Sequence, residues 1–131
     1  IERQHWERLE CFEILGIPEE YCVNEYGMTE MGTQYYDNKL KNHINNLKSE
    51  RHKVIPPWSR VLVINPETLE EVNNGEIGIL RHVDLTNRGS VIAIQTEDIG
   101  YKIGDGFEIV GRSSPIESRG CSISIDEMLL S

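Results

Sequence analysis

One short segment near the start of the chain combines residue types that suit a nucleotide phosphate. Residues 23–30 read Val-Asn-Glu-Tyr-Gly-Met-Thr-Glu. An extended stretch leads into a Tyr-Gly turn, where Gly27 lets the backbone approach a ligand closely, and the Thr29 hydroxyl and Glu30 carboxylate follow. Thr29 suits a phosphate, Glu30 suits Mg²⁺ because that ion prefers oxygen ligands, and the Tyr26 ring could stack on adenine. The same residues also fit a plain turn after a strand.

A carboxylate and a guanidinium group that could also serve a nucleotide occur far downstream in the sequence. Residues 96–98 read Thr-Glu-Asp, and residues 111–112 read Gly-Arg. For each of these two residues a purely structural role remains an alternative to nucleotide binding. Asp98 also fits a turn before Gly100, and Arg112 also fits an ion pair with a surface acid.

Composition limits the class of protein. The 131 residues suit one domain, with a net charge of −9 from 22 acidic and 13 basic residues. That balance argues against nucleic-acid binding, which needs clustered cations. No apolar run reaches the roughly 20 residues of a membrane span, and no signal segment opens the chain. We therefore expect a cytoplasmic protein. The missing initial Met leads us to expect a piece of a longer polypeptide.

Cysteines and histidines show no metal-binding pattern. Cys11, Cys22 and Cys121 lack Cys-x-x-Cys spacing, and the four histidines lack the paired helical spacing of a zinc site. Any Mg²⁺ is then expected to arrive with a nucleotide. Cys11 and Cys22 lie in apolar contexts typical of a core, whereas Cys121 lies in a polar Gly-Ser context near the end of the chain.

The hydrophobic pattern predicts an α+β fold that is mainly β. Apolar residues at helical spacing predict a helix over 2–15, ended by Gly16 and Pro18. A short buried strand is predicted over 21–25, and residues 35–53 are polar and predicted to be mostly loop. The remaining predicted strands cover 60–64, 76–83, 90–95 and 107–110, with Gly- and Asn-rich turns between them. Strands at this spacing predict a small antiparallel barrel or folded sheet, and we expect the β-barrel. We expect three parts, 1–54, 55–115 and a tail over 116–131.

Three ordered motifs together resemble the adenylate-forming enzymes, the superfamily of acyl-CoA synthetases and luciferases. Residues 25–30 resemble its Tyr-Gly-x-Thr-Glu motif, residues 75–78 its Gly-Glu-x-Gly strand, and residues 96–112 its later Asp- and Arg-bearing segment. The resemblance implies that Asp98 holds the ribose hydroxyls and that Arg112 contacts the nucleotide at the end of the large domain. It places this chain in the C-terminal part of that domain.

Within the superfamily the chain is most similar to the acyl-protein synthetases of bacterial bioluminescence, the LuxE type. The similar stretches are residues 24–30, 35–37, 84–90 and 119–122. In that family a Cys near the C-terminus receives the fatty acyl group, which points to Cys121. Only residues 113–131 follow Arg112. They are too few for the C-terminal lid of the usual CoA ligases.

The resemblance implies an ATP- and Mg²⁺-dependent acid–thiol ligase. A fatty acid would be activated as acyl-AMP, with Thr29 at the phosphate and Glu30 at Mg²⁺, and then transferred to the Cys121 thiol. Arg119 would lower the pKa of that thiol. An acyl reductase or another acceptor protein is an expected partner, self-association is left open, and the isolated chain is expected to be inactive. A phenylacetate-CoA-ligase-like enzyme and a non-catalytic β-barrel interaction module stay as alternatives.

Overall fold

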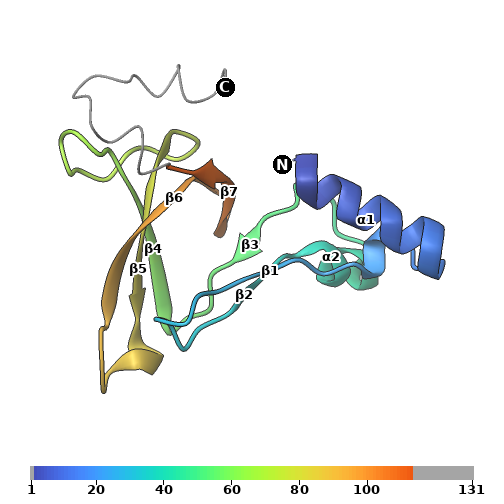
Figure 1. Ribbon diagram of the computed structural model, residues 1–131, viewed down its shortest axis with the longest axis horizontal. Coiled ribbons are helices and arrows are strands. Elements are labelled where there is room, and N and C mark those ends of the chain that lie inside the picture. The colour runs from blue at the N-terminus through green and yellow to red at the C-terminus, as the bar shows by residue number, and fades with distance from the viewer. Residues whose placement is uncertain (1, 114–131) are drawn as a thin grey trace.

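The computed structural model describes residues 2–113, which form two helices, two short 3₁₀ turns and seven strands (Figure 1). In chain order these are α1 (Glu2–Leu15), η1 (Glu19–Tyr21), β1 (Glu25–Tyr26), β2 (Tyr35–Tyr36), α2 (Lys39–Asn45), β3 (Lys53–Val54), β4 (Ser59–Ile64), β5 (Ile77–Asp84), η2 (Leu85–Asn87), β6 (Ala93–Ile103) and β7 (Gly106–Arg112). β1 and β2 form an antiparallel ribbon. The other five strands form an antiparallel sheet in the order β3-β7-β6-β5-β4.

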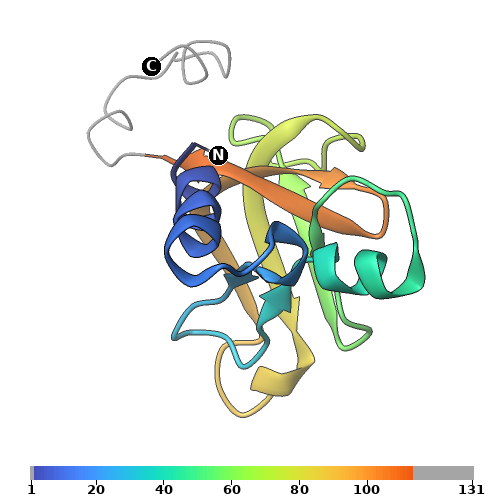
Figure 2. The ribbon, with the colours of Figure 1, turned by 90° about the vertical axis from the view of Figure 1, so that its right-hand side faces the viewer.

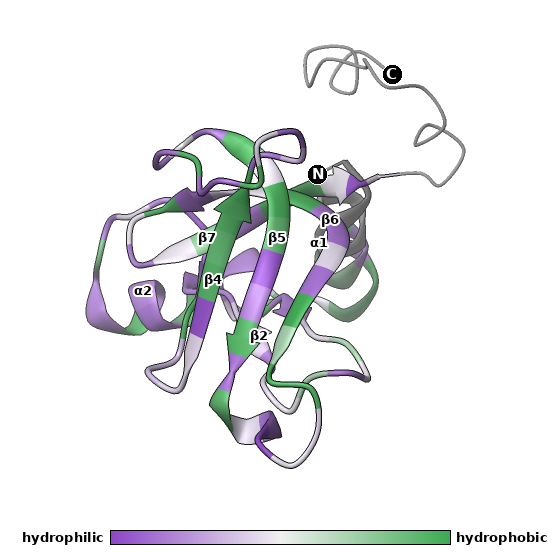
Figure 3. Cartoon of the chain, turned by 90° about the vertical axis from the view of Figure 1, so that its left-hand side faces the viewer, coloured by the Kyte–Doolittle hydropathy of each residue, from purple (hydrophilic) through white to green (hydrophobic). Residues whose placement is uncertain are grey.

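Every second side chain along the strands of the sheet lies in one hydrophobic core. Along β5 burial alternates residue by residue, as expected where one face of a strand is covered. Its buried members include Leu80, which packs with Val61 and Val63 of β4 and Phe107 of β7. In Figure 3 the apolar colour runs along most of β4, whereas β5 is apolar in its first part, polar in its middle and apolar again close to its end. Tyr35 and Met31, from the region of the β1–β2 ribbon, complete this core.

The helices lie apart from the long strands. In Figure 1 α1 and α2 occupy one side of the molecule and β4 and β5 the other, and Figure 2 shows the two helices from their own side. The predicted helix over 2–15 is confirmed, and it ends where Gly16 takes a φ of +67°. Phe12, Ile14 and Leu15 on α1 are exposed. No helix in residues 2–113 is long and apolar enough to cross a bilayer.

Two expectations about strands are wrong. The predicted buried strand over 21–25 is replaced by η1 and the two-residue strand β1, and both Tyr21 and Val23 are exposed. The predicted closed barrel is an open sheet, because the described residues pair no strand with the outer sides of β3 and β4. β3 has two residues, and Pro56 and Pro57 after it carry no backbone N–H to extend its ladder. Those prolines begin a turn instead, in which Ser59 donates its N–H to the Pro56 carbonyl.

The sheet is closely packed where β6 crosses the core. Gly100 pairs with Ile109 beside a register shift, and a β-carbon at Gly100 would clash with the Glu108 carbonyl and touch the Leu80 side chain. Gly111 belongs to the same strand pair, but a β-carbon there would meet nothing within 4 Å. The two glycines therefore differ in the space around them.

We expect Gly100→Ala to lower the free energy of unfolding by roughly 1–3 kcal/mol, because the backbone of β7 must move to admit the methyl group. Gly111→Ala should stay within about 0.5 kcal/mol of the parent chain. Urea unfolding followed by tryptophan fluorescence measures both changes. Equal effects of the two substitutions would contradict the close packing at Gly100.

Candidate functional site

The centre of the candidate site is a short hydrogen bond between two residues far apart in sequence. Tyr26, the last residue of β1, donates its hydroxyl to Asp98 Oδ2 at 2.6 Å. Burial raises the pKa of the Tyr26 phenol well above its usual value, and the bond to Asp98 raises it further. Tyr26 is therefore a fixed donor at neutral pH. Asp98 lies within β6, so it is no turn residue, and its own N–H donates to Thr96 Oγ1.

An aromatic cluster holds the Tyr26 ring in place. Its ring centroid lies 6.1 Å from that of Tyr35, 5.6 Å from that of His82 and 5.9 Å from that of Phe107. These partners come from β2, β5 and β7, and all three are buried. Because aromatic pairs at such separations are attractive, the cluster directs the hydroxyl toward β6.

Arg112 adds a cation at the edge of the same site. Asp98 and Arg112 are directly paired across β6 and β7, and Arg112 Nε lies 3.6 Å from Asp98 Oδ1 and 3.7 Å from Glu97 Oε2. Both separations are too long for direct hydrogen bonds. The Arg112 side chain is largely exposed, so its head group stays accessible. The structure thus brings together Tyr26, Asp98 and Arg112.

Thr29 and Glu30 lie on a different part of the site. Both are exposed in the turn between β1 and β2, which is closed by a bond from the Met31 N–H to the Met28 carbonyl. Within residues 2–113 neither side chain makes a hydrogen bond or an ion pair, so no lysine there pairs with Glu30. Gly27 is exposed directly after β1. Cys121 and Arg119 fall outside the described residues.

A buried carboxylate ties this turn to the main sheet. Asp84, the last residue of β5, accepts hydrogen bonds from the N–H and hydroxyl of Thr33, both at 2.8 Å, and from the N–H and hydroxyl of Thr86. Burial alone would raise the pKa of Asp84, but these four donors outweigh it and lower the pKa to about 2. The Trp58 indole N–H adds a bond to the Thr33 hydroxyl.

Asp84, Asn87, Tyr35 and His82 contribute to the site or its support, although none of them was predicted from the sequence to have a role there. Asp84 could have been noticed, since an Asp two residues before a Thr is a typical cap of a helical turn. No sequence pattern pointed to His82, because a single His in an apolar strand cannot be distinguished from the other residues of that strand. Its position next to Tyr26 depends on long-range packing.

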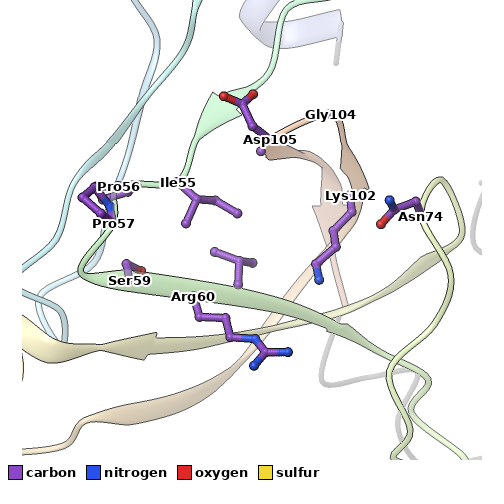
Figure 4. A pocket seen from close by; sticks show the side chains of 11 residues that line it. Ile55, Pro56, Pro57, Ser59, Arg60, Asn74, Lys102, Gly104 and Asp105 are labelled. Carbon is purple, nitrogen blue, oxygen red and sulfur yellow. The ribbon is translucent and has the colours of Figure 1, made fainter.

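A separate pocket of about 430 Å³ lies between the β3–β4 connection and the β6–β7 turn. Figure 4 shows Ile55, Pro56 and Pro57 on one side and Lys102 and Asn74 on the other. The Lys102 ammonium is paired with Glu71, which also lies near Arg60. None of the predicted site residues between positions 2 and 113 lines this pocket.

Solved structures with a similar fold include parts of two larger proteins. The chain superposes on the luciferase-like enzyme from the nonluminescent Zophobas morio mealworm with a TM-score of 0.57 and 18% identity, covering 82% of this chain and 29% of that one. McyG A-PCP complexed with phenylalanyl-adenylate gives a TM-score of 0.56 and 22% identity over 79% of this chain and 19% of that one. The chain therefore shares the fold of a portion of each of these two larger proteins.

The sequence comparisons identify the family. A family model described as "Acyl-protein synthetase, LuxE" matches residues 1–130. The long-chain-fatty-acid–luciferin-component ligase of Aliivibrio fischeri is 26% identical over 113 residues, which cover 79% of this chain and 27% of that protein. The Vibrio harveyi ligase of the same name is 21% identical over 134 residues, covering 97% and 33%. The chain belongs to the LuxE acyl-protein synthetase family, and it spans a third or less of these relatives. The resemblance inferred from the motifs is confirmed.

His82 should make the stability of the chain depend on pH. Its Nδ1 lies 3.2 Å from the Tyr35 hydroxyl, and its Nε2 is buried without a hydrogen-bond partner among residues 2–113. Burial lowers the pKa of His82 from 6.5 to about 4, although the charges of Asp98 and Asp84 act in the opposite direction. Between these values the unfolded chain binds the extra proton and the folded chain does not.

The free energy of unfolding should therefore fall as the pH is lowered from about 6.5 to about 4, by roughly 3 kcal/mol in total from this group. His82→Gln should remove that part of the pH dependence, whatever its effect at pH 7. The same change at His43, which is exposed on α2, is the control. Urea unfolding at a series of pH values measures both slopes, and an unchanged slope in His82→Gln would contradict a neutral buried imidazole.

Proposed function

We propose that this chain is the C-terminal part of an ATP-dependent acyl-protein synthetase, which activates a fatty acid as acyl-AMP and passes the acyl group to a Cys thiol. Family membership supports the ligase class. The fatty acid substrate is taken from the printed name of the curated relatives. We assign the activity to a protein of the relatives' length that carries this chain, and we expect the isolated chain to be inactive.

One observation carries the proposal. Three residues selected by two separate motifs, Tyr26, Asp98 and Arg112, come from β1, β6 and β7 and meet at one place. Tyr26 and Asp98 are 72 positions apart in the chain. A turn motif with no binding role would not need to place its tyrosine hydroxyl on this carboxylate.

Asp98 is suited to a ribose diol. Its Oδ2 is held by Tyr26, while its Oδ1 lies too far from Arg112 Nε for a direct hydrogen bond. An ionised carboxylate offers about four acceptor positions, so it can take the Tyr26 proton and still accept from two hydroxyls. The side chain is 17% exposed, which leaves it reachable by a ligand. Arg112 would neutralise charge beside the nucleotide, and the Tyr26 ring would contact the adenine.

The residues present fit a magnesium ion that arrives with ATP. Residues 2–113 contain no cluster of three or more His, Cys, Asp or Glu side chains that could hold a metal by themselves. Mg²⁺ typically keeps several waters and binds through one or two carboxylates together with substrate phosphates. The exposed Glu30 would supply that carboxylate, and Thr29 would steady the phosphate. The ion would neutralise charge on the phosphates.

The chemistry then divides into two steps. In the first, the fatty acid carboxylate attacks the α-phosphorus of ATP and pyrophosphate leaves, which is mainly a matter of positioning and charge neutralisation. In the second, the Cys121 thiolate attacks the acyl carbonyl and AMP leaves. An acyl reductase or another acceptor would take the acyl group onward.

Asp98→Ala in a protein of the relatives' length should lower ATP–pyrophosphate exchange about 10²-fold, because the ribose loses its anchor during adenylation. Glu97→Ala is the matched control, since Glu97 is the neighbouring exposed carboxylate and lies equally close to Arg112. It should exchange at nearly the parent rate. A urea unfolding curve for each variant checks that the fold persists. Equal rates for a folded Asp98→Ala variant and the parent would rule out the ribose role.

Cys121→Ser should separate the two steps. Acyl-AMP formation should continue, because the thiol takes no part in the attack on ATP, whereas transfer should stop or give a slower oxygen ester that resists hydroxylamine. Labelling with radioactive fatty acid, with and without hydroxylamine, measures this. The same substitution at Cys22 is the control. Full hydroxylamine-labile labelling of Cys121→Ser would exclude the acyl-cysteine role, and acyl transfer to free coenzyme A would then favour the CoA-ligase alternative.

A further inference from the structure

The turn that carries Thr29 and Glu30 has few bonds of its own. The ribbon that precedes and follows it has two residues in each strand, and the turn adds the single bond from the Met31 N–H to the Met28 carbonyl. Most of the hydrogen bonds that hold residues 30–33 from outside come from residues 84–87, the end of β5 together with η2. The Trp58 indole adds one more, to the Thr33 hydroxyl.

Asn87 holds the turn at the Glu30 peptide. Its Nδ2 donates to the Glu30 carbonyl at 2.7 Å and to the Val91 carbonyl at 2.8 Å. Both amide protons are therefore used, and one side chain joins the turn to the start of β6. The contact fixes the backbone of the residue whose carboxylate is the proposed magnesium ligand.

Asp84 holds the other end of the segment. Its carboxylate joins Thr33 to Thr86 through four hydrogen bonds, and Asp84 itself is almost completely buried. Between the two anchors the Gly32 backbone packs closely against the Thr86 side chain, since a β-carbon on Gly32 would lie 2.5 Å from Thr86 Oγ1. The segment from Glu30 to Thr33 is thus attached at both ends, with close packing between.

We propose that Asp84 and Asn87 are positioning residues for adenylation, because they set where the Thr29 hydroxyl and the Glu30 carboxylate stand relative to Asp98. This inference rests on the proposed function. Neither residue needs to touch the substrate. A displacement of the proposed ligands by about 1 Å is enough to slow a reaction that depends on orientation by about 10²-fold.

The first test uses the 131-residue chain and needs no activity. Amide hydrogen exchange is measured at Met31, whose N–H closes the turn, and at Thr33, whose N–H is bound to Asp84. Asn87→Ala should speed exchange at Met31 about tenfold relative to Leu80 in the core. In the parent chain the turn can open only if the hydrogen bond from Asn87 to the Glu30 carbonyl also breaks, and the variant lacks that bond. Asp84→Asn should do the same at Thr33.

Asn65→Ala is the matched control for Asn87→Ala. Asn65 is likewise a half-buried asparagine at a turn that makes two side-chain hydrogen bonds, because its Oδ1 accepts from the N–H groups of Glu67 and Thr68. It lies in the β4–β5 connection, away from the Thr29–Glu30 turn. Its loss should leave Met31 exchange unchanged. Parent-like exchange in Asn87→Ala, or an equal acceleration in both variants, would overturn the proposal.

The second test uses a protein of the relatives' length. Asn87→Ala should raise the Mg²⁺ concentration for half-maximal ATP–pyrophosphate exchange about tenfold and lower kcat, while the KM for fatty acid stays within about twofold. A general loss of folding would instead reduce the active fraction without moving the Mg²⁺ midpoint. Asn87→Asp should be at least as impaired, because a carboxylate would then face two carbonyl oxygens.

The outcomes separate this inference from the proposed function. If the parent protein shows no exchange with any fatty acid, the proposed function fails, and the hydrogen-exchange measurement still decides whether Asn87 fixes the turn. If the parent is active and both Asn87 variants keep its Mg²⁺ midpoint and kcat, the positioning role is wrong while the proposed function stands.

Discussion

The attachment of the β1–β2 ribbon to the five-stranded sheet is the constraint on which the candidate site depends. A ribbon of two residues per strand is not stable by itself in water. Here Tyr26 and Tyr35 from the ribbon pack against His82 and Phe107 from the sheet. This one cluster both attaches the ribbon and aims the Tyr26 hydroxyl at Asp98. Stability and site geometry therefore depend on the same contacts.

The polar groups buried beside that cluster are held in fixed protonation states. Asp84 stays ionised because four donors surround it, whereas His82 stays neutral because burial outweighs the nearby carboxylates. Elsewhere in the sheet the Lys53 ammonium is buried with its charge paired to Glu108 at 3.1 Å. Paired and hydrogen-bonded groups of this kind specify one arrangement, since any alternative packing would leave a charge unsatisfied.

Local patterns in the sequence predicted the elements but not their assembly. The helix over 2–15 and the strands around 60–64, 76–83 and 107–110 follow from apolar spacing and turn residues. Closure of the sheet into a barrel could not be predicted from these local patterns. It depends on whether β3 is long enough to pair with a further strand on its outer side, and Pro56 and Pro57 keep β3 short. Asp98 was selected by its motif, yet its donor Tyr26 lies 72 positions away and is placed only by tertiary packing.

The site therefore has two parts that differ in how they are held. Asp98 and Arg112 are directly paired on neighbouring strands of the sheet, so their spacing is set by the sheet itself. Thr29 and Glu30 lie on an exposed turn whose position depends on side-chain bonds from Asp84 and Asn87. A nucleotide bound across both parts would contact the sheet at its ribose and the turn at its phosphates. Since charge changes at the phosphate during adenylation and not at the ribose, the proposed function would depend most on the side-chain bonds that hold the turn in place.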